Sequence, residues 1–144
     1  MASIKRTASA AWSGPGKTGT GSVSTQSGRL KDTPYSFSTR FENGPGTNPE
    51  ELIAAAHAGC FTMALAFQLD AAGHSAEKLA TEAKVSIEPE GGGFTIKSVH
   101  LSLHGKVPGM TAEQFATAAA AAKTGCPVSK VLNAEITLDA KLDS

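Results

Sequence analysis

The sequence predicts a fold of the α+β class, in which strands and helices are grouped along the chain instead of alternating regularly. Two observations lead to this prediction. The expected elements run in the order strands, one long helix, strands, helices and a final strand. The length of 144 residues suits one domain, and a hydrophobic content of 40% is enough for a folded core. We expect a single domain over residues 1–144, with an N-terminal β arm over residues 1–47 and a helix–sheet body over residues 48–144.

The N-terminal arm is rich in Gly, Ser and Thr and holds few large apolar residues. Three short strands separated by glycine turns are expected in it: residues 11–12, 19–25 and 34–40. In the last of these, Tyr35, Phe37 and Thr39 alternate with polar residues, which predicts a half-buried strand that carries Arg40. A sheet with so little apolar surface is not stable alone, so we expect the arm to pair with another part of the protein.

A long helix is expected to follow a loop that contains Gly and Pro turn signals. Thr47 or Asn48 suits the N-cap, and Pro49 suits the first helical position. The apolar run then continues to about Leu69, and Gly73 ends the helix.

The second half of the chain is expected to contain two strands, two helices and a last strand: residues 84–88, 94–103, 111–123, 128–132 and 135–139. The inward positions of the second strand change parity, which predicts a β-bulge near Lys97 and Ser98. Thr111 and Gln114 have the spacing of a capping box at the start of the first of these helices.

Charge and motif content exclude several classes of function. Thirteen basic residues balance thirteen acidic ones, so the net charge of zero gives no reason to expect nucleic acid or an anionic membrane as partner. Residues 14–19 match the pattern G-x-G-x-x-G, but a strand instead of a helix follows, which predicts a hairpin turn and no nucleotide site.

The apolar run over residues 52–69 has the length of a membrane span, but it contains His57, Thr62 and Gln68 and lacks flanking basic or aromatic clusters. A buried core helix is the better prediction. The first residues lack the apolar segment of a secretory signal, so we expect a cytoplasmic protein.

Two cysteines, Cys60 and Cys126, are the leading candidates for chemistry, because a reducing compartment favours a redox pair over a structural disulfide. Cys60 lies about 15 Å into the long helix, beyond the reach of the helix dipole. Its thiolate therefore needs a cation from elsewhere. Arg40 is the best candidate, with Glu50 able to hold the guanidinium through a bidentate pair.

Cys126 is expected at the N-cap of the short helix, where backbone N–H groups favour a thiolate. Local chemistry alone therefore leaves open which cysteine attacks first. A zinc site could combine both cysteines with His57, His100 and His104. These residues show none of the spacings typical of zinc ligands, so no metal is predicted.

Four segments together resemble the OsmC/Ohr family, the osmotically inducible protein C and organic hydroperoxide resistance proteins. They are residues 38–42, 44–52 and 54–61, with the second cysteine motif over residues 126–130. The arginine in the Ser-Thr-Arg-Phe segment before the long helix is similar to the OsmC branch.

The resemblance implies a thiol peroxidase in which Cys60 is the peroxidatic thiol and Cys126 resolves its sulfenic acid as a disulfide. Arg40 and Glu50 match the pair that activates the thiolate. The implied reductant is an external dithiol such as dihydrolipoamide, with no other cofactor. The implied assembly is an intertwined homodimer: antiparallel sheets wrap around two long central helices, the N-terminal strands cross to the partner, and both active sites lie at the interface.

Two other interpretations also fit the sequence. The same scaffold suits a non-catalytic redox sensor or small-ligand-binding protein that uses the cysteine pair as a slow switch. The pair is alternatively structural and inert to peroxide. Phe61, Met63 and Phe67 suit either an organic substrate or the packing of the core, and core packing is the expected role of each.

Overall fold

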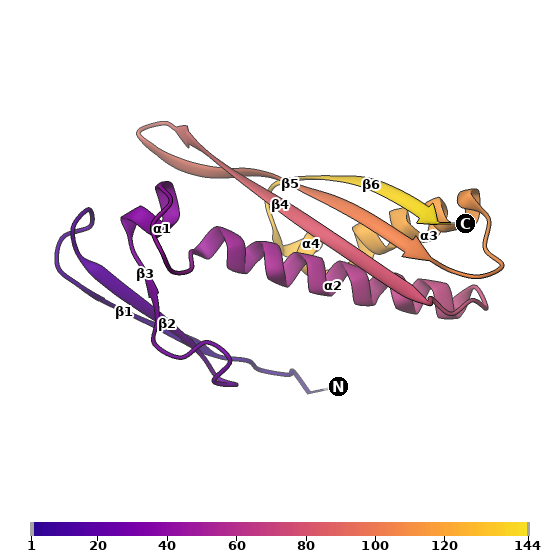
Figure 1. Cartoon of the computed structure of the whole chain (residues 1–144), viewed down its shortest axis with the longest axis horizontal. Helices are drawn as coiled ribbons and strands as arrows, with labels where there is room; N and C mark the ends of the chain where they lie inside the picture. The colour runs from indigo at the N-terminus through magenta and orange to yellow at the C-terminus, as the bar shows by residue number, and fades with distance from the viewer. Residues whose placement is uncertain (1, 144) are drawn as a thin grey trace. The chain divides into compact units, whose positions relative to one another are not determined.

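Each half of the chain builds its own three-stranded sheet, as Figure 1 shows. The computed structural model describes residues 2–143. They fall into two units, the first ending at Leu52 and the second beginning at Ile53.

In the first unit, β1, β2 and β3 form an antiparallel sheet in that order; they span Ala8–Ser13, Thr20–Thr25 and Thr33–Tyr35. The hairpin between β1 and β2 closes where the N–H of Gly19 donates to the carbonyl of Pro15 at 2.7 Å. Gly14 adopts a φ of 93°, which glycine tolerates without strain. The glycine pattern over residues 14–19 is thus the predicted hairpin turn.

The strand predicted over residues 34–40 is wrong beyond Tyr35, because a short helix, α1 (Phe37–Phe41), begins there. Ser36 and Thr39 form a capping box: the N–H of Thr39 donates to Ser36 Oγ at 3.3 Å, and the N–H of Ser36 donates to Thr39 Oγ1 at 2.8 Å. These reciprocal bonds satisfy amides that the first turn of a helix leaves without partners. Arg40 therefore lies in the last turn of α1.

The long helix α2 (Pro49–Ala71) begins as predicted, with the N–H of Glu51 donating to Asn48 Oδ1 at 2.7 Å. It ends before Gly73, whose φ is 82°. Among the described residues, α2 is the helix long and apolar enough to cross a membrane by length and composition, with a mean hydropathy of 1.6. Its Phe61, Leu65 and Leu69 side chains are buried in the second unit, as in the core helix of a soluble protein.

The sheet of the second unit has the order β4-β5-β6, with strands over Lys78–Glu90, Gly93–Lys106 and Glu135–Asp143. β4 and β5 are antiparallel, but β5 and β6 are parallel, so the expectation of antiparallel sheets is wrong for this pair. A parallel neighbour needs a crossover connection, and α3 (Ala112–Gly125) and α4 (Pro127–Val131) supply it.

The predicted bulge lies at Lys97. Ser86 pairs with Ser98 and Ile87 pairs with Ile96, so Lys97 is the extra residue. β4 is longer than predicted, since pairing with β5 extends it back through residues 78–83, which include Ala, Lys and Glu residues of low intrinsic β preference.

α2 and α3 cover the same face of this sheet, and the core lies between them and the strands. Its buried apolar residues are Phe61, Leu65, Leu69, Val99, Leu101, Leu103, Val107, Phe115, Ala118, Ala119, Ala122 and Cys126. Cys126 therefore belongs to the core itself.

Gly105 of β5 lies directly under the Phe115 ring, and we expect Gly105→Ala to destabilise the protein. A Cβ there would lie 2.5 Å from the ring and 3.1 Å from Leu79 Cδ2. Overpacking of this kind costs about 1–3 kcal/mol. Urea unfolding measures the loss. Gly125→Ala is the matched control, because nothing lies within 4 Å of its added Cβ; equal stability of both variants would contradict the prediction.

Candidate active site

The two cysteine sulfurs meet inside the second unit. Cys60 Sγ and Cys126 Sγ lie 2.7 Å apart, and both thiols are free. Cys126 is fully buried, whereas Cys60 is partly exposed. A disulfide bond is about 2.05 Å long, so a small movement suffices to join the pair.

Local structure fixes the position of Cys126. The residue ends α3, where its N–H donates to the carbonyl of Ala122 at 2.9 Å. It also begins α4, where its own carbonyl accepts from the N–H of Lys130 at 3.1 Å. Pro127 suits the first position of α4 because it needs no N–H partner there. The turn between the two helices directs the Cys126 side chain into the core, toward α2.

The surroundings of Cys60 within the second unit favour its neutral thiol. Burial raises the pKa of Cys60, and the hydrogen bond to Cys126 raises it further. The backbone amide of Val128 acts in the opposite direction and limits this rise in the pKa of Cys60. A reactive thiolate therefore needs a further source of positive charge.

Val128 changes the expectation about the short helix. The amides at the start of this helix are expected to favour a thiolate at Cys126, but the amide of Val128 lowers the pKa of Cys60 instead. No sequence signal reveals this contact, because a backbone donor comes from any residue type and its target lies on another helix.

Arg40 and Glu50 form the predicted bidentate pair in the first unit. Arg40 Nε lies 3.1 Å from Glu50 Oε1, and Arg40 Nη2 lies 3.0 Å from Glu50 Oε2. The Glu50 side chain is 9% exposed and that of Arg40 is 38% exposed. Among the described residues, Arg40 Nη1 has no hydrogen-bond partner, so one edge of the held guanidinium is available to an anion.

The loop between α1 and α2 holds this pair in place. Asn48 Nδ2 donates to the carbonyl of Thr39 at 2.9 Å, and the N–H of Thr47 donates to the carbonyl of Pro34 at 2.9 Å. Gly46 adopts a φ of 128°, and a Cβ there would lie 2.5 Å from the same carbonyl. These contacts join the end of α1, which carries Arg40, to the start of α2.

The three histidines considered as zinc ligands each have a different polar neighbour. His57 is fully buried, with Nε2 lying 2.7 Å from Ser129 Oγ. On β5, His100 Nδ1 lies 2.6 Å from Thr137 Oγ1, and His104 Nδ1 lies 3.7 Å from Asp143 Oδ1. Among residues 2–143, no group of three or more His, Cys, Asp or Glu side chains is placed to hold a metal ion.

Because burial lowers the pKa of His57, we expect it to make stability fall in acid. Below about pH 6.5 the unfolded chain takes up a proton that the buried ring resists, so the free energy of unfolding decreases until the folded pKa is reached. Urea unfolding between about pH 7.5 and about pH 5.5 measures this slope. His57→Gln should reduce the slope, and His104→Gln, at an exposed ring, should not. An unchanged slope in His57→Gln would contradict the prediction.

Two hollows border α2 in the second unit. One runs between α2 and β4 and has a volume of about 540 Å³. Its lining residues are Ala58, Gly59, Thr62, Met63, Ala66, Leu79 and Thr81. Phe61 packs in the core, as expected. Met63 and Phe67 are 64% and 67% exposed, so the expectation of core packing is wrong for these two residues.

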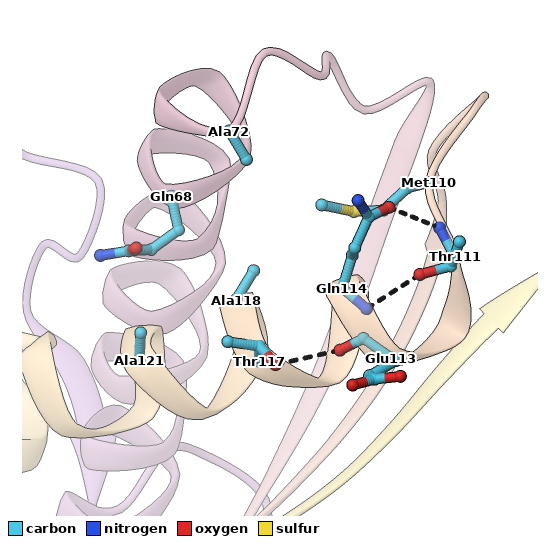
Figure 2. Close-up of a pocket in the computed structure, with 9 residues that line it drawn as sticks. All are labelled: Gln68, Ala72, Met110, Thr111, Glu113, Gln114, Thr117, Ala118 and Ala121. Atoms are coloured by element: carbon cyan, nitrogen blue, oxygen red, sulfur yellow. Dashed lines mark hydrogen bonds between the residues drawn. The ribbon is translucent and has the colours of Figure 1, made fainter.

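The other hollow lies between the C-terminal half of α2 and the N-terminal half of α3 (Figure 2). Gln68 lines it and lies eight residues beyond Cys60, about 12 Å along the helix. Across it, Gln114 and Thr111 are occupied by their mutual capping bonds. This hollow is therefore separate from the thiols.

Two free thiols in contact beneath a mixed sheet define a dithiol redox protein. Comparison with known proteins then identifies the family. The model of the OsmC-like protein family matches residues 42–141. A curated relative, peroxiredoxin OsmC of Escherichia coli strain K12, is 50% identical over 141 residues, covering 98% of this chain and 99% of the relative. The chain belongs to the OsmC-like family, and it is a thiol peroxidase.

Solved structures agree with this assignment. An organic hydroperoxide resistance protein from Elizabethkingia anophelis matches with a TM-score of 0.74 and 28% identity, covering 99% of this chain and all of that one. An organic hydroperoxide resistance protein OsmC from Legionella pneumophila matches with a TM-score of 0.70 and 26% identity, covering 98% and 99% of the two chains. The predicted α+β fold and family are confirmed.

Proposed function

We propose that this protein reduces organic hydroperoxides to alcohols through Cys60 and Cys126, and that an external dithiol restores the two thiols. The observation that carries the proposal is the 2.7 Å separation of the two sulfurs. Relatives named for organic hydroperoxide resistance support the substrate class.

In the first step, the Cys60 thiolate attacks one oxygen of the peroxide. The O–O bond breaks, Cys60 becomes a sulfenic acid, and the alkoxide takes up a proton and leaves as the alcohol. Cys60 is assigned this role because it is the more exposed cysteine and because the amide of Val128 favours its thiolate, whereas Cys126 is fully buried.

In the second step, the Cys126 sulfur attacks the sulfenic sulfur of Cys60. The S–S bond forms, the S–O bond breaks, and the hydroxide leaves as water with the proton of the Cys126 thiol. An external dithiol then reduces the disulfide by exchange and becomes a disulfide itself. Dihydrolipoamide is our candidate for this reductant.

Arg40 and Glu50 are proposed to supply the positive charge that the second unit lacks. A guanidinium beside a thiol favours the thiolate and lowers its pKa. Glu50 keeps the guanidinium fixed through its bidentate bonds. We propose that Arg40, held by Glu50, is the residue that activates Cys60, and that residues 1–144 form one domain.

The hollow between α2 and β4, which is lined by Gly59, the chain neighbour of Cys60, supports a preference for alkyl peroxides. Its walls include the apolar side chains of Met63, Ala66 and Leu79, which suit a hydrocarbon tail. Steady-state turnover tests the function: tert-butyl and fatty-acid hydroperoxides are compared with hydrogen peroxide, each with dihydrolipoamide and with other dithiols. We expect repeated turnover and faster reduction of the organic peroxides. No turnover with any dithiol would overturn the proposed function.

We further propose a homodimer in which the arm over residues 1–47 reaches the partner and the α2 helices pack together. The exposed Met63 and Phe67 side chains support this assembly, because large apolar groups on one helix face mark an interaction surface.

Phe67→Glu is expected to weaken this dimer, because it introduces a charge into an apolar contact. Sedimentation velocity should then show monomers at concentrations where the wild type is dimeric. Gln68→Glu adds the same charge at the neighbouring exposed residue and is the matched control. A dimeric Phe67→Glu variant, or a monomeric wild type, would contradict this assembly.

The compartment proposed for the protein is the cytoplasm, where thiols are kept reduced. A redox sensor on the same scaffold is the second candidate, because the raised pKa of Cys60 in the second unit suits a slow thiol. A sensor oxidises once and stops, even with excess dithiol, so the same turnover measurement separates the two functions.

A further inference from the structure

α4 and the cysteine that begins it touch α2 through two side-chain contacts. Cys126 Sγ lies 2.7 Å from Cys60 Sγ, and Ser129 Oγ lies 2.7 Å from His57 Nε2. His57 and Cys60 are three residues apart on α2, and Cys126 and Ser129 are three apart across α4, so one helical turn of each faces the other. The His57–Ser129 bond therefore lies one turn from the reacting sulfurs.

Apart from these contacts, α4 has no fully buried side chain to fix its position. It spans five residues, none of which is buried, and Val131 is 77% exposed. A helix of this length is not stable by itself. Val128 and the following Leu132 are partly buried and pack against the core. The hydrogen bond to His57 joins α4 to a residue that is 0% exposed on the central helix.

Burying His57 costs stability, and its bond to Ser129 offers a reason for a polar residue at this position. Among the described residues its Nδ1 atom is buried and has no hydrogen-bond partner. Leaving a buried polar atom unpaired is unfavourable, and an apolar side chain of similar size would fill the space without that loss. The hydrogen bond to the Ser129 hydroxyl therefore explains why an imidazole occupies this position.

We propose that His57 and Ser129 are positioning residues that hold α4 against α2, so that Cys126 resolves the Cys60 sulfenic acid before a second peroxide reaches it. The inference rests on the proposed function and assigns a role to a pair outside the reacting atoms. Without the bond, α4 moves away from α2 for part of the time. The turn between α3 and α4 then loosens at Cys126, and its thiol spends less time against Cys60. The sulfenic acid then persists, and further peroxide oxidises it to the sulfinic acid by adding one more oxygen.

The test is a single-turnover experiment on the full chain that separates two rates. Loss of peroxide reports the first oxidation, and mass spectrometry of quenched samples reports sulfenic acid, disulfide and sulfinic acid. Ser129→Ala should slow disulfide formation by about tenfold, the equivalent of one buried hydrogen bond, and should change the first oxidation much less. Sulfinic acid should accumulate at high peroxide.

Three further variants show whether the hydrogen bond is responsible. Ser129→Thr keeps the hydroxyl and should restore the fast disulfide step. The double variant with His57→Leu and Ser129→Ala should be no slower than Ser129→Ala, because both changes remove one interaction. Thr124→Ala removes an exposed hydroxyl that bonds only within α3, and it should behave as the wild type.

The results distinguish the failure of this inference from that of the proposed function. If peroxide never produces a disulfide in the wild type, the proposed function fails. If the wild type forms the disulfide and Ser129→Ala forms it at the same rate, only the positioning role of His57 and Ser129 is overturned. Equal slowing of both steps by Ser129→Ala, or no rescue by threonine, also overturns it.

Discussion

Cys60→Ser is expected to lose peroxidase turnover by a factor on the order of 10³ or more, because no other group replaces the attacking thiolate. Cys126→Ser is expected to behave differently. It should consume one equivalent of hydroperoxide quickly and then stop, with Cys60 held as a sulfenic acid that a nucleophilic probe traps. The measurement is peroxide consumption with dithiol in excess, followed by mass analysis of the protein.

The pair of variants also tests the order of attack. Retained single oxidation in Cys60→Ser, with none in Cys126→Ser, would assign the attack to Cys126. Both substitutions keep a side chain of similar size, so unfolding curves close to that of the wild type would confirm that the comparison is one of chemistry.

Arg40→Ala is expected to raise the pKa of the Cys60 thiol and to slow its oxidation at neutral pH. A cation within about 4–6 Å lowers the pKa of an acidic group by about 1–3 units, so its removal should cost roughly tenfold or more at pH 7. The sign follows from protonation. Without the guanidinium the neutral thiol persists to higher pH, so the rate rises later with pH and approaches that of the wild type in alkali.

A pH–rate profile of the first oxidation measures this effect. Arg40→Lys should recover part of the rate, because the ammonium keeps the charge but loses the bidentate hold of Glu50. Arg29→Ala removes an exposed arginine of the first unit and is the matched control. If the Arg40→Ala profile coincides with that of the wild type, Arg40 has no part in activating the thiol.

Local sequence signals predicted the parts of the fold that depend on neighbouring residues. Asn48 begins α2 and Thr111 begins α3 because each cap bonds to an amide three residues away. The bulge at Lys97 is visible as a change of parity in the strand itself. The Arg40–Glu50 pair is also close in the chain, ten residues apart.

The features that the sequence alone did not reveal depend on competing or distant interactions. The alternation of Tyr35, Phe37 and Thr39 indicated a strand, but the capping box of Ser36 and Thr39 stabilises α1. The parallel pairing of β6 depends on where α3 and α4 return the chain. The contact of His57 with Ser129 joins residues 72 apart, although the matching spacing of three in the two cysteine motifs was a usable signal.

The most direct test is peptide mapping of the wild type after one molar equivalent of tert-butyl hydroperoxide, without reductant and with free thiols blocked at the time of quenching. We predict a single disulfide within one chain that links the peptides of Cys60 and Cys126, and no remaining sulfenic acid. Free Cys126 beside an oxidised Cys60, or a disulfide between two chains, would contradict the account.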